Sequence, residues 1–152
     1  PYGEIIPLEA ERGYNTTLTS PNINIQRELI FSEHGFVASP IKTGIRIGGG
    51  AEFGGLKIPP NYKRSKHMLH KAKDFLPNLN IKEGIDWMGF RPTLPDSKPV
   101  IGRSNYNPYL IHAYGHGHLG FTQGPATGEI IADLVTNNEP MIDLSPFRPS
   151  RF

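Results

Sequence analysis

Residues 109–135 read YLIHAYGHGHLGFTQGPATGEIIADLV and contain the strongest structural signal in the chain. Tyr109 to Tyr114 is a short apolar run typical of a strand, and the loop 115–120 spells G-x-G-x-x-G. A helix is expected next, with Pro125 in its first turn, where a missing N–H is tolerated. We predict a strand, a glycine loop and a helix whose N–H groups and dipole favour an anion or a carbonyl oxygen.

A glycine pattern of this kind also occurs in dinucleotide-binding folds. Those folds need a second parallel strand after the helix, with an acidic residue at its end. Here the expected helix runs out near Asn137, Pro140 follows, and residues 141–152 hold few strand signals. The pattern is therefore the last strand, loop and helix of a larger arrangement, or a chance match around a tight turn.

The composition is that of a globular chain, with 152 residues of which 37% are hydrophobic and 20% charged. That length is enough for one domain with a sizeable core, and the balance excludes an intrinsically disordered chain. The absence of cysteine excludes disulfides and thiolate metal sites. A net charge of +2 gives no argument for nucleic acid as a partner, and no apolar run is long enough for a membrane span.

The first part of the chain carries short apolar runs between turn residues. Tyr14, Thr16 and Leu18 alternate as in a strand with one buried face. Glu33-His34-Gly35 separates two apolar runs and predicts a β-hairpin. We expect an antiparallel sheet with strands near residues 12–19, 27–32, 35–40, 44–50 and 84–91. A helix near residues 61–76 should cover one face of this sheet, so the predicted fold class is α+β.

Three other groups of residues allow a functional and a structural interpretation. The helix at 61–76 is crowded with cations, where a solvated face is the default and a basic binding module is the alternative. His112, His116 and His118 have the chemistry to bind zinc, but no carboxylate lies close in sequence, so we predict no metal site. The glycine triplet 48–50 predicts a bulge or a close crossing of strands.

Arg91 ends an apolar strand just before Pro92, where a hydrophobic core would not accept a guanidinium. A planar guanidinium at this position suits a substrate carboxylate, which it binds through two parallel hydrogen bonds. A salt bridge to one of the 14 acidic residues is the alternative, and the sequence does not separate the two.

Together these residues resemble the D-amino acid oxidase-type (DAO) family of FAD-dependent oxidoreductases, and within it most closely the bacterial D-amino acid dehydrogenases. The matching stretches follow the order of the family over nearly the whole chain. They are ERGYN at 11–15, EFGGL at 52–56, PPNY at 59–62, GFRPT at 89–93, PDSKPVIG at 95–102, GHGHLG at 115–120 and GPATG at 124–128.

The resemblance implies that the chain is the C-terminal part of such an enzyme. Residues 1–92 would supply the antiparallel sheet and helix of the substrate side. Residues 93–152 would supply the closing strand, glycine loop and helix of the FAD-binding domain. The N-terminal βαβ half of that domain is absent from this sequence, which opens Pro1-Tyr2-Gly3, and we expect a fragment without activity of its own.

The resemblance also implies roles for particular residues. The residues that would lie against the FAD are Gly117, His118, Leu119, Gly120, Phe121 and Thr122. Arg91 matches the position that binds the substrate carboxylate, and Tyr14 and His118 are further substrate-side candidates. None is assigned a direct catalytic role, because Arg91 would orient the substrate rather than transfer a proton.

The activity implied is oxidative deamination of a D-amino acid, with hydride transfer from the α-carbon to flavin N5. The electron acceptor would be a respiratory quinone in a dehydrogenase or oxygen in an oxidase. A glycine- or sarcosine-oxidase-like amine oxidase of the same family is the alternative enzyme. We expect a cytoplasmic protein, with peripheral attachment to the inner membrane as a variant. We also expect self-association through an apolar surface on strand 109–114 and the Ile130/Leu134 side of the last helix.

Overall fold

The computed structural model describes residues 3–152 of the chain, which divides into two compact units. One unit is Arg12–Phe90, and the other combines the residues up to Glu11 with Arg91–Phe152. The sequence-based prediction divided the chain into residues 1–92 and 93–152. Residues 1 and 2 of the first predicted part lie outside the described part of the chain. The structure groups the described residues before Arg12 with the C-terminal unit.

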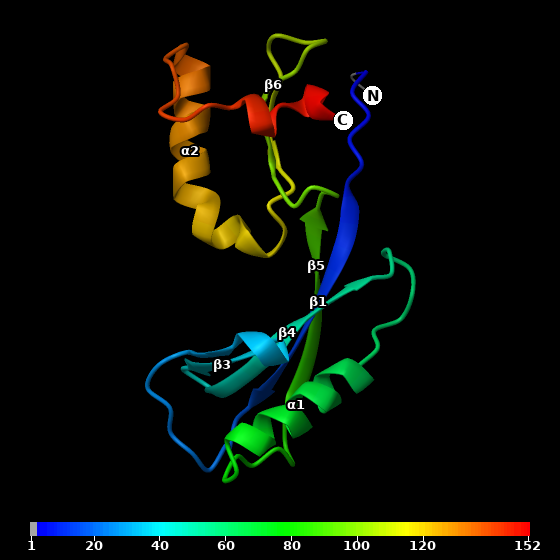
Figure 1. The fold of residues 1–152 in the computed structure, drawn as a ribbon, viewed down its shortest axis with the longest axis vertical. Helices are drawn as coiled ribbons and strands as arrows, with labels where there is room; N and C mark the ends of the chain where they lie inside the picture. Colours follow the sequence, from blue (N-terminus) through cyan, green and yellow to red (C-terminus); the bar gives the residue numbers. More distant parts are fainter. Residues whose placement is uncertain (1–2) are drawn as a thin grey trace. The chain divides into compact units, whose positions relative to one another are not determined.

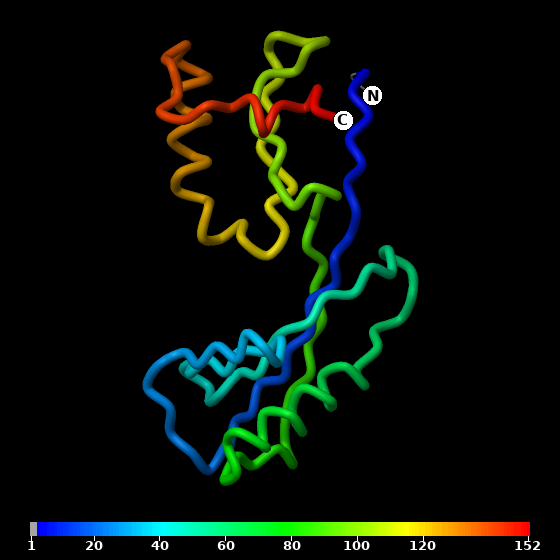
Figure 2. Tube along the Cα trace, viewed as in Figure 1, coloured from blue at the N-terminus to red at the C-terminus, as the bar shows by residue number. Residues whose placement is uncertain are grey.

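The Arg12–Phe90 unit is built on a five-stranded sheet in the order β2-β3-β4-β1-β5. The strands are β1 (Glu9–Leu18), β2 (Leu29–Phe31), β3 (Phe36–Ile41), β4 (Gly44–Phe53) and β5 (Ile85–Thr93). The β2–β3 and β3–β4 pairs are antiparallel. Figure 2 shows the traces of β1 and β5, which are neighbours in the sheet, side by side. The five predicted strands and the predicted hairpin are confirmed.

Glycines allow the close packing of β2, β3 and β4. A 3-10 turn, η1 (Ser32–His34), connects β2 to β3 and ends at Gly35, which has a left-handed backbone with φ 67°. A Cβ atom added to Gly49 would lie only 2.3 Å from the Gly35 carbonyl oxygen. The close approach predicted at the glycine triplet is therefore confirmed, because a side chain would separate the two segments.

Helix α1 (Lys63–Phe75) packs against β3 and β4, as Figure 1 shows. Its buried residues recur at helical spacing and form one stripe of Ser65, Met68, Leu69 and Ala72. They join the core cluster that includes Tyr14 and Leu18 of β1. Each fully buried large apolar side chain in such a core contributes roughly 1.5–3 kcal/mol, so burial of this stripe holds the helix on the sheet.

The second unit contains the strand, glycine loop and helix predicted from residues 109–135. Strands β6 (Val100–Arg103) and β7 (Ile111–Tyr114) form an antiparallel pair, and helix α2 (Gly120–Thr136) contacts both. The remaining elements are the 3-10 turns η2 (Gly117–Leu119), η3 (Ser145–Phe147) and η4 (Pro149–Arg151). Among residues 3–152, no helix has the length and apolar character needed to cross a membrane. The α+β class is confirmed.

Two details of α2 differ from the prediction. The helix begins at Gly120, and Pro125 lies inside it rather than in the first turn. Because proline has no N–H, the Phe121 carbonyl lacks its helical partner. Ile130 is only 5% exposed, because α2 packs against β6 and β7, so Ile130 itself is not part of an exposed apolar surface. Phe121 and Val135 are instead the exposed large apolar residues of the helix.

Candidate functional site

The candidate cofactor-binding residues lie together on η2 and the first turn of α2. Gly117, His118 and Leu119 form η2, and Gly120, Phe121 and Thr122 begin α2. No side chain within residues 3–152 caps either element at its N-terminus, and the first N–H groups of a helix have no intrahelical partner. The structure therefore brings all six predicted residues to one helix start.

Gly117 has a backbone conformation that favours glycine. Its φ is 54°, and a Cβ atom added there would lie 3.4 Å from Thr93 Oγ1. The loop therefore lies next to Thr93 at Gly117. A glycine at this position allows the left-handed backbone that brings the loop next to Thr93.

His116 fixes the glycine loop to α2. Its Nε2 lies 3.0 Å from Thr127 Oγ1, and the Thr127 hydroxyl donates to the Gln123 carbonyl at 2.9 Å. Because that hydroxyl proton is already donated, Nε2–H is the donor and Nδ1 of the neutral ring is unprotonated. Burial lowers the pKa of His116 below its ordinary value, which favours this neutral form. His116, to which the resemblance gave no role, is therefore a positioning residue of the loop.

The first turns of α2 hold a buried polar atom that has no partner. Gln123 Oε1 receives no hydrogen bond from any residue in the described part of the chain. Such an atom costs about 1–3 kcal/mol, so an N–H group of a ligand is its natural partner. A helix start with free N–H groups and one acceptor fits a flat ring edge that carries both carbonyl and N–H groups, as the flavin edge does. No sequence signal pointed to Gln123, because helical spacing does not reveal which polar atoms lack a partner.

The histidines considered as metal ligands have separate environments. His112 Nε2 lies 2.8 Å from Glu4 Oε2, whereas His118 is exposed. Burial disfavours the charged Glu4, but hydrogen bonds from the Asn105 N–H and other donors outweigh it and lower the pKa of Glu4. Within residues 3–152, no three potential metal-ligating side chains form a group. His112 therefore pairs with Glu4 within the unit that contains Arg91–Phe152.

Arg91 forms the salt bridge that was the alternative to substrate binding. Its Nη1 lies 2.7 Å from Glu11 Oε1, and the two side chains are 30% and 11% exposed. This contact uses one nitrogen of the guanidinium. Among the described residues, no second carboxylate pairs with Arg91. Glu11 thus orients Arg91, and the binding of a substrate carboxylate by Arg91 stays a prediction.

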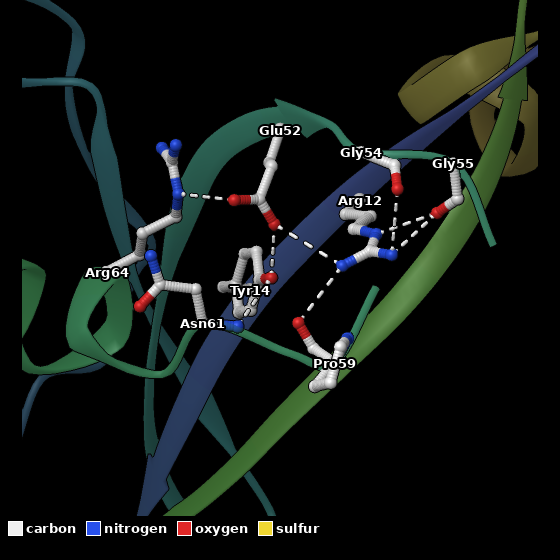
Figure 3. Close-up of polar contacts among 8 residues, drawn as sticks. All are labelled: Arg12, Tyr14, Glu52, Gly54, Gly55, Pro59, Asn61 and Arg64. Atoms are coloured by element: carbon white, nitrogen blue, oxygen red, sulfur yellow. Dashed lines mark hydrogen bonds and ion pairs between the residues drawn. The ribbon is translucent and has the colours of Figure 1, made fainter. Parts of the chain in front are cut away.

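Tyr14 lies in a polar network within the Arg12–Phe90 unit (Figure 3). Its side chain is buried, and its hydroxyl donates to Glu52 Oε2 at 2.5 Å. The same hydroxyl accepts the Asn61 N–H at 3.0 Å. The Tyr14 hydroxyl thus supports Glu52, and a role of Tyr14 on the substrate side stays a prediction.

Arg12 is the centre of this network and is completely buried. Its Nε and Nη2 donate to the Gly55 carbonyl at 2.9 and 2.7 Å, and Nη2 also donates to the Gly54 carbonyl at 3.1 Å. Nη1 donates to the Pro59 carbonyl at 3.3 Å and lies 3.7 Å from Glu52 Oε2. One side chain therefore holds the segment that connects β4 to α1, as Figure 3 shows.

Glu52 receives contacts from three sides. The hydrogen bond from Tyr14, together with the charges of Arg64 and Arg12, lowers the pKa of Glu52 below its ordinary value. Arg64 Nε lies 3.1 Å from Glu52 Oε1. The ERGYN and EFGGL stretches, which are separate in the sequence, therefore meet in one network. Contacts between positions this far apart leave no local pattern in the sequence.

The comparison with family models identifies the architecture that these residues build. The model for DAO, FAD dependent oxidoreductase, matches residues 2–134 of this chain. The chain belongs to the DAO family. The oxidoreductase class and the FAD dependence expected from the sequence are confirmed at the level of this family.

Two curated members of the DAO family are similar to nearly the whole chain. A D-amino-acid oxidase from Bradyrhizobium diazoefficiens is 34% identical over 99% of this chain and 37% of its own length. D-amino acid dehydrogenase 1 from Mesorhizobium japonicum is 27% identical over 97% of this chain and 36% of its own length. The chain therefore spans little more than a third of either relative.

A solved structure of the DAO family has the same fold as this chain. Glycine oxidase from Geobacillus kaustophilus superposes on 99% of this chain and 41% of its own, with a TM-score of 0.81 at 22% sequence identity. At this identity the similarity concerns the fold. The expected antiparallel sheet with a closing strand, loop and helix is thus the arrangement of a known DAO-family structure.

Proposed function

We propose that this chain is the C-terminal part of an FAD-dependent oxidoreductase that oxidises a D-amino acid to an imino acid, which water then hydrolyses. The observation that carries this proposal is the 34% identity to a D-amino-acid oxidase over 99% of the chain. The free helix start and the orientation of Arg91 by Glu11 are consistent with it.

The residues at the start of α2 would hold one edge of the flavin. When bound, FAD supplies an acceptor for the hydride that leaves the α-carbon of the substrate. The Leu119 N–H already donates to the His116 carbonyl at 3.1 Å, so the other N–H groups of the Gly117–Thr122 segment would face the ring edge, where the helix dipole favours negative charge. Gln123 Oε1, which has no partner among the described residues, would accept an N–H of the ring.

Arg91 would bind the carboxylate of the amino acid. Glu11 occupies one nitrogen of the guanidinium and thereby restricts its rotation. The remaining N–H groups offer a planar edge that matches a carboxylate. Arg91 would thus position the α-carbon for reaction, which is catalysis by orientation.

The partners of the longer protein belong to the same proposal. The electrons would pass to a respiratory quinone or to oxygen, and the remaining part of FAD would bind to a segment outside this sequence. Self-association through the apolar surface expected on strand 109–114 and the last helix belongs to the same proposal, and the 95% exposed side chain of Tyr109 is consistent with it.

Anaerobic reduction of the full-length protein tests the proposed activity. We expect a panel of D-amino acids to bleach the flavin absorbance, with their L-enantiomers at least about tenfold slower, because the wrong enantiomer loses about 1.4 kcal/mol or more of oriented contact. Equal rates for both enantiomers, or bleaching by glycine and sarcosine alone, would contradict the D-amino acid assignment. Absence of flavin in the purified protein would contradict the whole proposal.

Substitutions at two glycines of α2 test separately whether the start of this helix holds the flavin edge. Gly120→Leu places a side chain at the helix start without backbone strain, because Gly120 has a helical φ of −57°, and its added Cβ would lie in contact with His116 Cβ at 3.4 Å. We expect at least about a tenfold loss of FAD occupancy, since a bulky group there prevents close approach to the N–H groups. The matched control is Gly128→Leu, which has no atom within 4 Å of its added Cβ and should keep its FAD. Equal occupancy in both variants would place the flavin elsewhere.

A further inference from the structure

Helix α1 and the loop before it form the most positively charged segment of the chain. Six of the 16 Lys and Arg residues lie within residues 57–73, and none of the 14 acidic residues does. With histidine neutral, this segment carries a charge of +6, whereas the remaining ten cations and 14 acidic residues give the rest of the chain a charge of −4. A charge asymmetry of this size indicates a surface that meets an anionic partner.

The cations of α1 lie away from its buried stripe. The exposed cations of the helix are Lys63, Arg64, Lys66 and Lys73. Within the described part of the chain, Arg64 is the one cation of residues 57–73 that forms a salt bridge, which it makes with Glu52. The one acidic residue of the helix, Asp74, lies near its C-terminal end. The unit therefore leaves most of this positive charge without a paired carboxylate.

The loop that leads from β4 into α1 carries exposed apolar side chains. Leu56 and Ile58 are 69% and 62% exposed, and the residue between them is a lysine. Arg12 donates to the carbonyls of Gly55 and Pro59, on either side of these residues, as Figure 3 shows. The loop is thus fixed at both ends with its aliphatic side chains outside the core of the unit.

A hollow of about 340 Å³ lies beside the first turns of α1. Its lining includes the cationic side chains of Lys63 and Arg64, together with His67. Gly49 and Gly50 of β4 also line it, and a Cβ atom added to Gly50 would meet no atom within 4 Å. None of the described residues that line the hollow carries a carboxylate, so its charge suits a phosphate group.

We propose that α1 and the loop before it form a surface that binds the headgroups of an anionic phospholipid bilayer. The cations contact lipid phosphates, and Leu56 and Ile58 enter the boundary between the headgroups and the acyl chains. Aliphatic side chains gain free energy at this boundary but not on the phosphate backbone of a nucleic acid, so the bilayer is the favoured partner. The surface lies within the Arg12–Phe90 unit and does not depend on the proposed oxidation.

Sedimentation of the full-length protein with vesicles tests this proposal. The probes are vesicles of phosphatidylcholine alone and vesicles of phosphatidylcholine with an equal amount of phosphatidylglycerol. We expect at least about tenfold tighter binding to the anionic vesicles, because each cation near an anionic surface contributes to the affinity. The binding should weaken as salt is added. Flavin reduction by D-amino acids is measured on the same protein, so a failure of the proposed function is seen separately.

Substitutions at exposed lysines test the charged contacts. The combined variant Lys63→Gln, Lys66→Gln and Lys73→Gln should bind the anionic vesicles at least about tenfold more weakly. The matched control, Arg27→Gln, Lys42→Gln and Lys98→Gln, removes the same charge at exposed positions outside the segment and should bind like the unchanged protein. Equal binding to both kinds of vesicle, or an equal loss in both combined variants, would overturn the proposal. Tighter retention on duplex DNA than on the anionic vesicles at the same salt would also overturn it, in favour of a nucleic-acid partner.

A pair of isoleucines tests whether the loop enters the bilayer. Ile58→Ser should weaken binding to the anionic vesicles about tenfold, because an isoleucine side chain would no longer be buried there. Ile30→Ser is the matched control, since Ile30 of β2 is 67% exposed and lies outside the segment, and it should bind like the unchanged protein. If both variants bound equally well, the insertion of the loop would be refuted.

Discussion

Replacing Arg12 with methionine is expected to destabilise the Arg12–Phe90 unit by roughly 3–5 kcal/mol, the range found when one member of a buried ionic network is removed. Arg12 is completely buried and donates to the carbonyls of Gly54, Gly55 and Pro59. Methionine fills similar space but donates no hydrogen bond. The three carbonyls and Glu52 would therefore lose the partner that they share, and a buried position would lose its hydrogen bonds.

Urea unfolding followed by Trp87 fluorescence measures this loss, because Trp87 lies in the same unit. Arg64→Met is the matched control, since Arg64 also pairs with Glu52 but its side chain is 47% exposed. Exposed pairs contribute little to stability, so the control should unfold close to the unchanged protein. If the two variants had the same midpoint, the network would not hold the β4–α1 segment as we describe.

Arg91→Lys in the full-length enzyme is expected to lower kcat/KM for the amino acid, mainly through a higher KM. The loss of binding free energy should be on the order of 2–4 kcal/mol. A lysine ammonium is a point charge and does not reproduce two parallel hydrogen bonds to a carboxylate. The contact of Arg91 with Glu11 strengthens this expectation, because it holds the guanidinium in one orientation. The shorter and more flexible lysine side chain would not keep that orientation.

Steady-state kinetics with a D-amino acid, compared with the corresponding amino-acid amide, would measure the effect. The amide lacks the carboxylate charge, so its turnover should respond much less to Arg91→Lys. Arg148→Lys, at an exposed position of the same unit, serves as the control and should leave both substrates unaffected. If Arg91→Lys left the kinetics of the amino acid unchanged, Arg91 would be only a structural partner of Glu11.

Several features of this protein were predictable from the sequence because their physical causes are local. Alternation at Tyr14, Thr16 and Leu18 places these side chains on one face of a strand, and all three are buried. The stripe of α1 follows the helical period in the same way. Gly49 has no side chain, and the sequence alone indicated that strands approach each other there.

Other features depend on residues that folding brings together. Arg91 and Glu11 are 80 residues apart, and Arg12 reaches carbonyls 42 to 47 residues away. No spacing in the sequence encodes such a pair, so the salt bridge of Arg91 stayed an open alternative and the network of Arg12 was missed. The hydrogen bonds of the Tyr14 hydroxyl with Glu52 and Asn61 were not predictable for the same reason.

By itself, the sequence determined the α+β class, the positions of the strands and helices, and the DAO-family resemblance, because periodicity and ordered motifs are carried by neighbouring residues. Only the tertiary structure decided which polar groups are satisfied within the chain. It left Gln123 Oε1 and Asn15 Oδ1 buried without a hydrogen-bond partner among the described residues. A hydrogen bond requires two groups at contact distance, and that distance is set by the packing of the whole unit.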